Sequence, residues 1–332
     1  MVAYVIRRIL IMIPTLVAIS IISFIIIQLP PGDFLTTYMA QRAERGEPAD
    51  QAEIEALRQR FGLDQPLYKQ YLYWAWNFLH GDMGHSFEWN RPVSSLIAER
   101  IPLTILISTC TLLFTWAVSV PIGVYSAVRQ YSWVDYFLTF IGFIGLATPN
   151  FLFALVLLWI SYAYLGMSIG GLFSPQFADA SWSIAKFIDL LKHLWIPVII
   201  VGTAHTAKFI RIIRGNLLDE LKKPYVTTAR AKGLSETRLI LKYPVRVAIN
   251  PLVSTIGWTL PELISGIAIT AVVLNLPTSG PLLLSALLSQ DMQLAGGFIM
   301  LLSFLTVVGT LVSDILLAWV DPRIRFGARE GA

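Results

Sequence analysis

The sequence predicts an all-α integral membrane protein with six transmembrane helices, both termini cytoplasmic, an external loop after helix 1 and a cytoplasmic loop between helices 4 and 5. Of its 332 residues, 55% are hydrophobic and only 14% are charged, against about 25% charged in soluble domains. Residues 101–128 and 136–178 carry no charge at all, and each stretch exceeds the ~20 apolar residues that cross a bilayer. This composition excludes an ordinary cytosolic enzyme.

The first expected span covers residues 9–29, directly after Arg7 and Arg8. Its apolar stretch is longer than the core of a signal peptide, and no small-residue cleavage site follows it, so we expect a retained helix. The two arginines place its N-terminus inside by the positive-inside rule. Residues 30–100 then contain ten acidic and seven basic side chains, which predicts a large loop outside the bilayer.

Two helices are expected in this external loop. The first begins after Asp50, which forms a capping box with Glu53, and it stops at Gly62. Its apolar face comprises Ile54, Leu57 and Phe61.

The second external helix, over residues 66–79, carries five aromatic residues within nine positions: Tyr68, Tyr71, Tyr73, Trp74 and Trp76. Tyrosine and tryptophan favour the level of the lipid headgroups, which predicts a helix on the outer membrane surface. Alternatively, these aromatic side chains form the core of the loop itself. Both interpretations can hold at once.

The remaining spans follow from apolar runs bounded by charge. We expect a break in the third span, because Pro149 removes a backbone donor in the Thr148-Pro149-Asn150 sequence. The five spans are residues 101–128, 135–164, 193–213, 249–273 and 295–320. The expected divisions are therefore a first helix over 1–29, an external region over 30–100, and a five-helix core over 101–332.

The loop between the fourth and fifth spans, residues 214–248, lies in the most basic part of the chain. Residues 208–246 contain ten basic and three acidic side chains, so the positive-inside rule places this loop in the cytoplasm. We expect one helix before Pro224 and another from Tyr225, ending in a turn at Gly233 with positive φ. Ser235 is expected to cap the next helix, with Glu236 in its first turn.

This loop resembles the coupling loop of ABC-importer permeases, in the form "TARAKGL" (Thr228 to Leu234) that the oligopeptide and dipeptide branch favours, with Pro251 18 residues after the glycine. Residues 7–33 resemble the first helix of that branch, "FGLDQPLYKQYLYW" and "GDMGHS" its external loop, and "DPRIR" its C-terminal signature. The sequence departs from the branch after the fifth span, where Ala271, Leu274 and residues 278–280 replace its usual pattern.

The resemblance implies that the loop docks on a separate ATP-hydrolysing subunit and passes nucleotide-driven closure to the spans as rigid-body motion. Arg230, Lys232 and Glu236 are candidates for pairing with that subunit, and Ala229 and Gly233 for close backbone approach. The alternative, in which cations only anchor the loop to anionic lipid, is preferred for Lys208, Arg211 and Arg214. The complete set of coupling residues is Thr228, Ala229, Arg230, Ala231, Lys232, Gly233, Leu234 and Glu236.

The resemblance further implies a permease subunit in the inner membrane of a prokaryote, forming half of the pathway for an oligopeptide-type solute. Its expected partners are a second homologous permease, two ATP-binding subunits, an external solute-binding protein and the lipid bilayer, without nucleic acid. ATP and Mg²⁺ would be held by the partner subunits, with no cofactor in this chain. Some members of the branch carry oligosaccharides, opines or nickel complexes instead of peptides.

Catalytic and metal-binding motifs are missing from the sequence. It contains no GxxxxGK[ST] phosphate loop, so ATP hydrolysis is expected on another chain. Cys110 is the single cysteine, which excludes an intrachain disulfide and a cysteine zinc site. The four histidines, His80, His85, His193 and His205, show no paired ligand spacing.

Glu262 follows Pro261 in the middle of the fifth expected span, where an ionised carboxylate costs about 2.5–3.5 kcal/mol. It either lines the solute pathway or is a protonated or interhelically bonded residue at the proline kink. Other candidates for the pathway lining are Asn150, Thr255, Thr259 and Ser265.

Two other functional classes remain open. A stand-alone proton-coupled transporter would need several buried titratable groups along one path, and only Glu262 qualifies. A membrane-anchored receptor or enzyme would work through its external loop, but that loop has neither a disulfide nor a nucleophile constellation.

Overall fold

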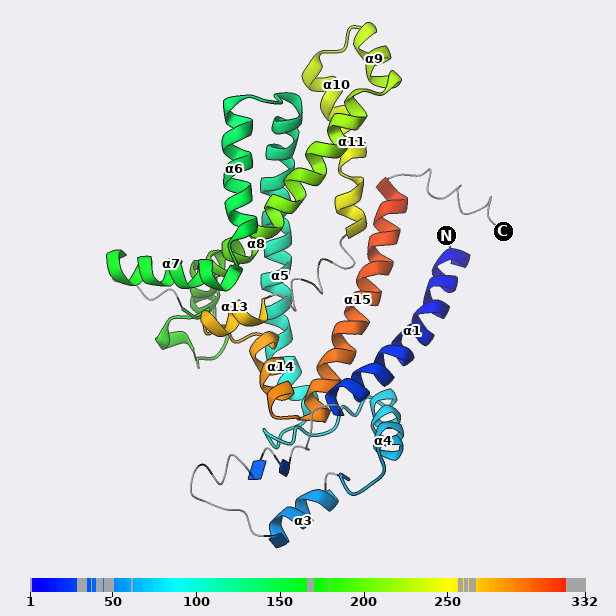
Figure 1. Ribbon diagram of the computed structural model, residues 1–332, viewed down its shortest axis with the longest axis vertical. Coiled ribbons are helices and arrows are strands. Elements are labelled where there is room, and N and C mark those ends of the chain that lie inside the picture. Colours follow the sequence, from blue (N-terminus) through cyan, green and yellow to red (C-terminus); the bar gives the residue numbers. More distant parts are fainter. Residues whose placement is uncertain are drawn as a thin grey trace. The chain divides into compact units, whose positions relative to one another are not determined.

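The computed structural model describes residues 2–28, 35–36, 38–39, 44, 51–60, 62–165, 170–178, 180–255, 259, 262 and 267–320. Regular structure in this part is helical, with an isolated β-bridge between His85 and Pro92. Figure 1 shows the helices in chain order from blue to red, and the chain divides into two compact units. Unit 1 comprises Met1–Thr104 and Thr278–Val308, and unit 2 comprises Ile105–Pro277 and Gly309–Ala332.

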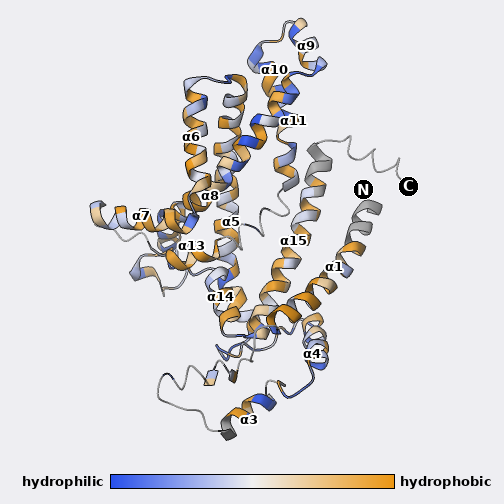
Figure 2. Ribbon diagram, viewed as in Figure 1, coloured by the Kyte–Doolittle hydropathy of each residue, from blue (hydrophilic) through white to orange (hydrophobic). Residues whose placement is uncertain are grey.

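Three helices are long and apolar enough to cross a membrane within the described residues. They are α1 (Val2–Gln28), α5 (Val93–Val128) and α15 (Met292–Val320). A fourth candidate is the pair α6 (Trp133–Ala147) and α7 (Asn150–Leu165), whose axes bend by 101°. Figure 2 shows the hydrophobic colouring of these helices and the more hydrophilic α9 and α10. The fold is therefore all-helical with three or four candidate spans.

The break predicted at Thr148-Pro149-Asn150 is confirmed. Helix α6 ends at Ala147, and Thr148 is its C-cap with an extended backbone. The residue before a proline disfavours helical backbone angles, and the extended backbone of Thr148 ends the helix here. The chain restarts as α7 at Asn150.

Helix α8 (Ile184–Leu221) is longer at both ends than the fourth span expected over residues 193–213. Ser183 caps it by accepting a hydrogen bond from the Lys186 amide at 3.2 Å. The stretch between the third and fourth expected spans therefore ends in helix. The cytoplasmic helix expected before Pro224 is the last part of α8. The fifth expected span, residues 249–273, lies partly outside the described residues.

Unit 1 is built around a core that joins distant segments of the chain. Helix α4 (Leu67–Leu79) contributes Trp74, and Phe87 follows it in the chain. Residues of α14 (Ser279–Leu288) and α15 return to pack beside them, including Ala286 and Phe298. Helix α3 (Gln51–Arg60) adds Ile54 and Leu57 to this core, as its predicted apolar face requires. The expected stop at Gly62 is confirmed by its φ of +66°, whereas Asp50 and Phe61 lie outside the described residues.

Unit 2 is organised around α8, against which α5, α6 and α7 pack. Glycines permit the close approach. A Cβ at Gly123 of α5 would lie 2.9 Å from Ile213 Cβ, and one at Gly145 of α6 would lie 2.6 Å from Thr203 Cγ2. Small residues at helix interfaces are typical of membrane bundles. Unit 2 also contains α9 (Pro224–Ala231), α10 (Glu236–Lys242), α11 (Pro244–Ala248) and α13 (Ala268–Val273).

Candidate functional site

The turn predicted at Gly233 connects α9 to α10. Gly233 has a φ of +77°, a conformation that costs other residues about 1–2 kcal/mol. Its amide donates to Arg230 O at 3.0 Å, and the Lys232 amide donates to Thr228 O at 3.1 Å. The expected order of helix, glycine turn and helix is therefore confirmed.

The segment from α9 to α11, which we name the knob, has its own apolar core. Val226 and Ala229 of α9 pack with Leu239 and Ile240 of α10 and with Val245 and Ala248 of α11. The same cluster includes Leu217 of α8 and Ala127 of α5. The knob is therefore packed against the ends of two long helices, as a rigid-body coupling element requires.

Ala229, a candidate for close backbone approach, also contributes to the packing of the knob. Its side chain lies inside the core of the knob, because the helical repeat turns this position of α9 toward α10 and α11. Leu234 is also partly buried against that core. The small size of Ala229 fits the packing within the knob.

The charged candidates lie on the knob surface, and two of them pair with each other. The Arg230 guanidinium donates to both carboxylate oxygens of Glu236, with Nη2 to Oε2 at 3.1 Å. The hydrogen bond from Arg230 lowers the pKa of Glu236, and the bond to Glu236 raises the pKa of Arg230. Both side chains are exposed, so the pair can exchange partners at little desolvation cost.

The other coupling candidates differ in their local contacts. The Thr228 hydroxyl donates to Pro224 O within α9 at 3.0 Å, whereas Ala231 and Lys232 are exposed. Ser235 occupies the N-cap position of α10 ahead of Glu236, as predicted, but its side chain makes no capping hydrogen bond. The capping role expected of its hydroxyl is therefore wrong.

The three cations of α8 that precede the knob have different surroundings. Arg214 Nη2 lies 2.9 Å from Asp135 Oδ2, and its Nε donates to Ser126 O at 3.4 Å. Lys208 Nζ lies 3.9 Å from Glu262 Oε2. Lys208 and Arg214 therefore have counter-charges within the chain, and anionic lipid is not needed to neutralise them.

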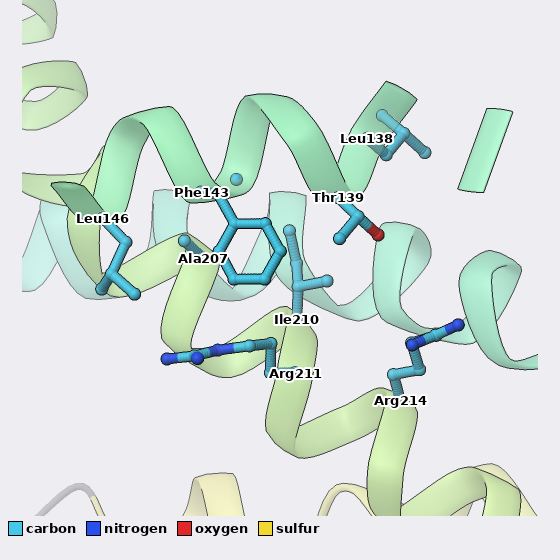
Figure 3. Close-up of a pocket in the computed structure, with 9 residues that line it drawn as sticks. Leu138, Thr139, Phe143, Leu146, Ala207, Ile210, Arg211 and Arg214 are labelled. Atoms are coloured by element: carbon cyan, nitrogen blue, oxygen red, sulfur yellow. The ribbon is translucent and has the colours of Figure 1, made fainter. Parts of the chain in front are cut away.

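Arg211, between these two cations, lines a pocket of about 90 Å³ between α6 and α8 (Figure 3). Its guanidinium carbon lies 6.0 Å from the centroid of the Phe143 ring, within the range of a cation–π interaction. The pocket is otherwise mostly apolar, with Leu138, Leu146 and Ile210 in its lining. Within the described residues, no carboxylate forms an ion pair with Arg211.

The predicted pathway residues have different surroundings in the described part of the chain. Glu262 is exposed and faces Lys208, whereas Thr259 is buried. The Thr255 hydroxyl donates to Leu252 O at 2.8 Å, and Asn150 begins α7 at the break. Ser265 lies outside the described residues. Glu262 is therefore the candidate with a charged neighbour.

The histidines show no metal-binding arrangement. Among the described residues, no group of three or more His, Cys, Asp or Glu side chains could hold a metal ion. His80 Nδ1 lies 2.8 Å from Trp76 O, and His193 Nδ1 lies 2.8 Å from Asp189 O. Their ring nitrogens thus contact the preceding helical turn.

Sequence reasoning missed the buried carboxylates Asp135, Asp189 and Asp291. Asp135, in the first turn of α6, is the partner of Arg214, and Asp291 precedes α15 and accepts a hydrogen bond from Ser86 at 2.5 Å. Each is a charge beside a predicted span boundary, a position that also suits a solvated end residue. Nothing in the sequence pattern distinguishes a buried carboxylate from a solvated one at such a position.

Two family models match the chain. The model described as "Binding-protein-dependent transport system inner membrane component" matches residues 119–326. An N-terminal model of the same transport-system membrane component matches residues 1–108. Together these matches include both the knob and the external region.

Individual relatives are similar over nearly their whole length. The oligopeptide transport system permease protein AppB of Bacillus subtilis is 37% identical, over 98% of this chain and 100% of the relative. The dipeptide transport system permease protein DppB of Escherichia coli K12 is 30% identical, over 98% and 99%. The peptidoglycan transport system permease protein YejB of Agrobacterium fabrum is 30% identical, over 99% of each.

Proposed function

The chain belongs to the family of binding-protein-dependent transport system inner membrane components, and from this premise we propose that it forms half of the pathway for an oligopeptide-type solute in an ATP-driven importer. It is a multi-pass membrane permease of the bacterial importer type and a non-catalytic component. The proposal places it in the inner membrane of a prokaryote.

The observation that carries the mechanism is the internal packing of the knob. Val226, Leu239 and Val245 link its three helices, and Leu217 and Ala127 connect them to α8 and α5. A displacement of the knob is therefore transmitted to α5 and α8 as a displacement of rigid elements. Its exposed Arg230, Lys232 and Glu236 supply charge for docking on an ATPase subunit.

Six spans with both termini inside are the topology that we propose. The candidate spans α1, α5 and α15 and the bent pair α6–α7 support four of them. Helix α8 supports a fifth, because its apolar middle continues into the basic segment before the knob. The remaining span would run through residues 249–273.

The proposed assembly contains a second homologous permease, two ATP-binding subunits and an external solute-binding protein. ATP and Mg²⁺ belong to the ATP-binding subunits in this proposal, since the chain has no phosphate loop. The solute-binding protein would deliver the solute to the external side.

The names of the relatives support a peptide as the solute, because they include an oligopeptide and a dipeptide permease. The same importer class with an oligosaccharide, an opine or a nickel complex is the second candidate. Within the pathway, the Lys208–Glu262 pair supports a polar lining near Glu262. A stand-alone proton-coupled transporter is disfavoured, because the pathway candidates form no chain of titratable groups.

The test of the coupling role is Gly233→Val, with Gly81→Val as the matched control. Both glycines have positive φ (+77° and +83°), and a Cβ at either would meet nothing within 4 Å. The two variants therefore carry the same kind of backbone strain, but Gly81 lies in the external region. Tagged variants would be purified from host membranes in mild detergent, and co-purifying subunits identified by mass spectrometry.

We expect an ATPase with a phosphate loop to co-purify with the wild type and with Gly81→Val. Gly233→Val should insert into the membrane but lose the ATPase, or retain it with ATP hydrolysis uncoupled from solute uptake. Normal uptake by Gly233→Val would refute the docking role. A homo-oligomer of the wild type without an ATPase would refute the importer assignment.

A further inference from the structure

Helix α4 has apolar side chains on two faces, one packed and one exposed. Its inner face places Tyr71, Trp74 and Phe78 against the core of unit 1. On its outer face, Tyr68, Leu72, Trp76 and Leu79 are 63%, 61%, 64% and 81% exposed. We name these four residues the outer face of α4. Their spacing of three or four positions places them on one side of the helix.

The contact with α1 fixes the depth of α4 relative to the membrane. The hydroxyls of Tyr71 and Ser20 lie 2.9 Å apart, and the Tyr71 and Phe24 rings meet edge to face at 5.3 Å. Since α1 ends at Gln28, these contacts lie about 6–12 Å inside its outer end at ~1.5 Å rise per residue. Figure 1 shows α4 beside that end of α1.

The contact with α15 gives a second, separate depth. A Cβ on Gly296 would lie 3.1 Å from the Trp74 indole, so Trp74 packs directly on the backbone there. Gly296 is four residues after the start of α15 at Met292, which is about 6 Å along the helix. Both candidate spans therefore place α4 at the depth of ~5–10 Å to which interfacial helices insert.

The chemistry of the outer face suits lipid at that depth. Tyr68 and Trp76 combine an apolar ring with a polar group, as residues at the bilayer border do, while Leu72 and Leu79 are wholly apolar. Lys69 is the single charged residue within Leu67–Leu79, and a lysine there can extend its ammonium to the headgroups. A water-facing helix would expose far more charge.

We infer that the outer face of α4 is inserted at the hydrocarbon–headgroup border of the outer leaflet, with phospholipid as its partner. The inner face holds the external region of unit 1 on α1 and α15, and the outer face holds it on the bilayer. The external region is then fixed in height above the membrane, on the side where the proposed function brings the solute-binding protein. The lipid contact itself does not depend on that delivery role.

Site-directed spin labelling tests this inference. In a Cys110→Ala background, single cysteines would be introduced as Leu72→Cys and Trp76→Cys on the outer face. Ala75→Cys, on the packed inner face, and Asp64→Cys, in the exposed turn before α4, are the matched controls. The labelled complex would be reconstituted into vesicles of phosphatidylethanolamine and phosphatidylglycerol, with the thermal unfolding midpoint of each variant checked against the wild type.

We expect nitroxides at positions 72 and 76 to collide preferentially with apolar oxygen, and the nitroxide at 64 with a water-soluble nickel chelate. Chelate accessibility at 72 and 76 equal to that at 64 would overturn the inference in favour of a water-exposed face. Inaccessibility to both reagents, as expected at 75, would overturn it in favour of a protein partner. If Trp76→Cys does not fold, Leu72→Cys still tests the inference, because it keeps every aromatic residue of α4.

Discussion

Each unit of the molecule buries a carboxylate at the N-terminus of a long helix, and the two carboxylates are stabilised differently. In unit 2, Asp135 is 2% exposed and lies 2.9 Å from the Arg214 guanidinium. In unit 1, Asp291 is 0% exposed and is held by neutral donors. These include the Ser86 hydroxyl and the backbone amides of Glu88 and Leu294.

The difference shows two ways in which the free-energy cost of burying a carboxylate is offset. An ion pair keeps a carboxylate ionised but requires its partner to stay in place. With neutral donors alone, burial raises the pKa of Asp291 even though the hydrogen bonds from Ser86 and the backbone oppose the shift. The burial of Asp135 therefore depends on a side-chain pair, whereas that of Asp291 depends on its own protonation state.

The largest expected effect is that of Asp135→Asn. It leaves the Arg214 charge partly buried without its counter-charge, and we expect a loss of about 3 kcal/mol in the free energy of unfolding. Asp219→Asn is the control, because Asp219 pairs with Lys222 at 3.9 Å on the exposed end of α8. Thermal unfolding in detergent measures both, and equal midpoints for the two variants would contradict the structural role of the pair.

Asp291→Asn should change the pH dependence of stability. The folded pKa of Asp291 is raised above the unfolded value near 3.8. Its contribution is therefore fully present below that value and is lost as the pH rises through the folded pKa. The wild type should lose stability over this window, whereas the variant, which keeps an acceptor for the cap, should not. A pH profile of the unfolding midpoint that is identical in both would show that another group controls it.

Glu262→Gln extends the comparison to an exposed carboxylate whose charged neighbour is farther away. Lys208 Nζ lies 3.9 Å away and both side chains are exposed, so stability should change little. If Glu262 lines the pathway, solute uptake into vesicles should fall several-fold. The exchanged pair Lys208→Glu with Glu262→Lys should restore part of it if the pair itself matters. Unchanged uptake by Glu262→Gln would favour the alternative, in which Glu262 is a protonated or interhelically bonded residue at the Pro261 kink.

The smallest expected effect on stability is that of Glu236→Gln. The pair with Arg230 is exposed, and the lowered pKa of Glu236 means that its contribution is present above pH 4.5 and is lost as the pH falls through the lower folded value. At neutral pH the unfolding midpoint should stay that of the wild type, while retention of the ATPase subunit weakens. A lowered midpoint with full ATPase retention would assign the pair to stability instead of docking.

Features that depend on consecutive residues could be predicted from the sequence. The apolar runs predicted α1, α5 and α15, Pro149 predicted the break between α6 and α7, and Gly233 predicted the turn of the knob. The sequence also showed five aromatic residues within nine positions of α4. It could not say which of them face a protein core, because periodicity defines faces and not the neighbours that cover them.

The sequence by itself determined the membrane class, the break, the glycine turn and the resemblance to importer permeases, because each depends on local composition or on a short contiguous pattern. Tertiary structure alone decided that Arg214 meets Asp135, that Lys208 meets Glu262 and that Ala229 faces inward. The physical reason is distance. Electrostatic and packing energies depend on separation in space, and positions that are far apart in the chain become neighbours only when the helices pack.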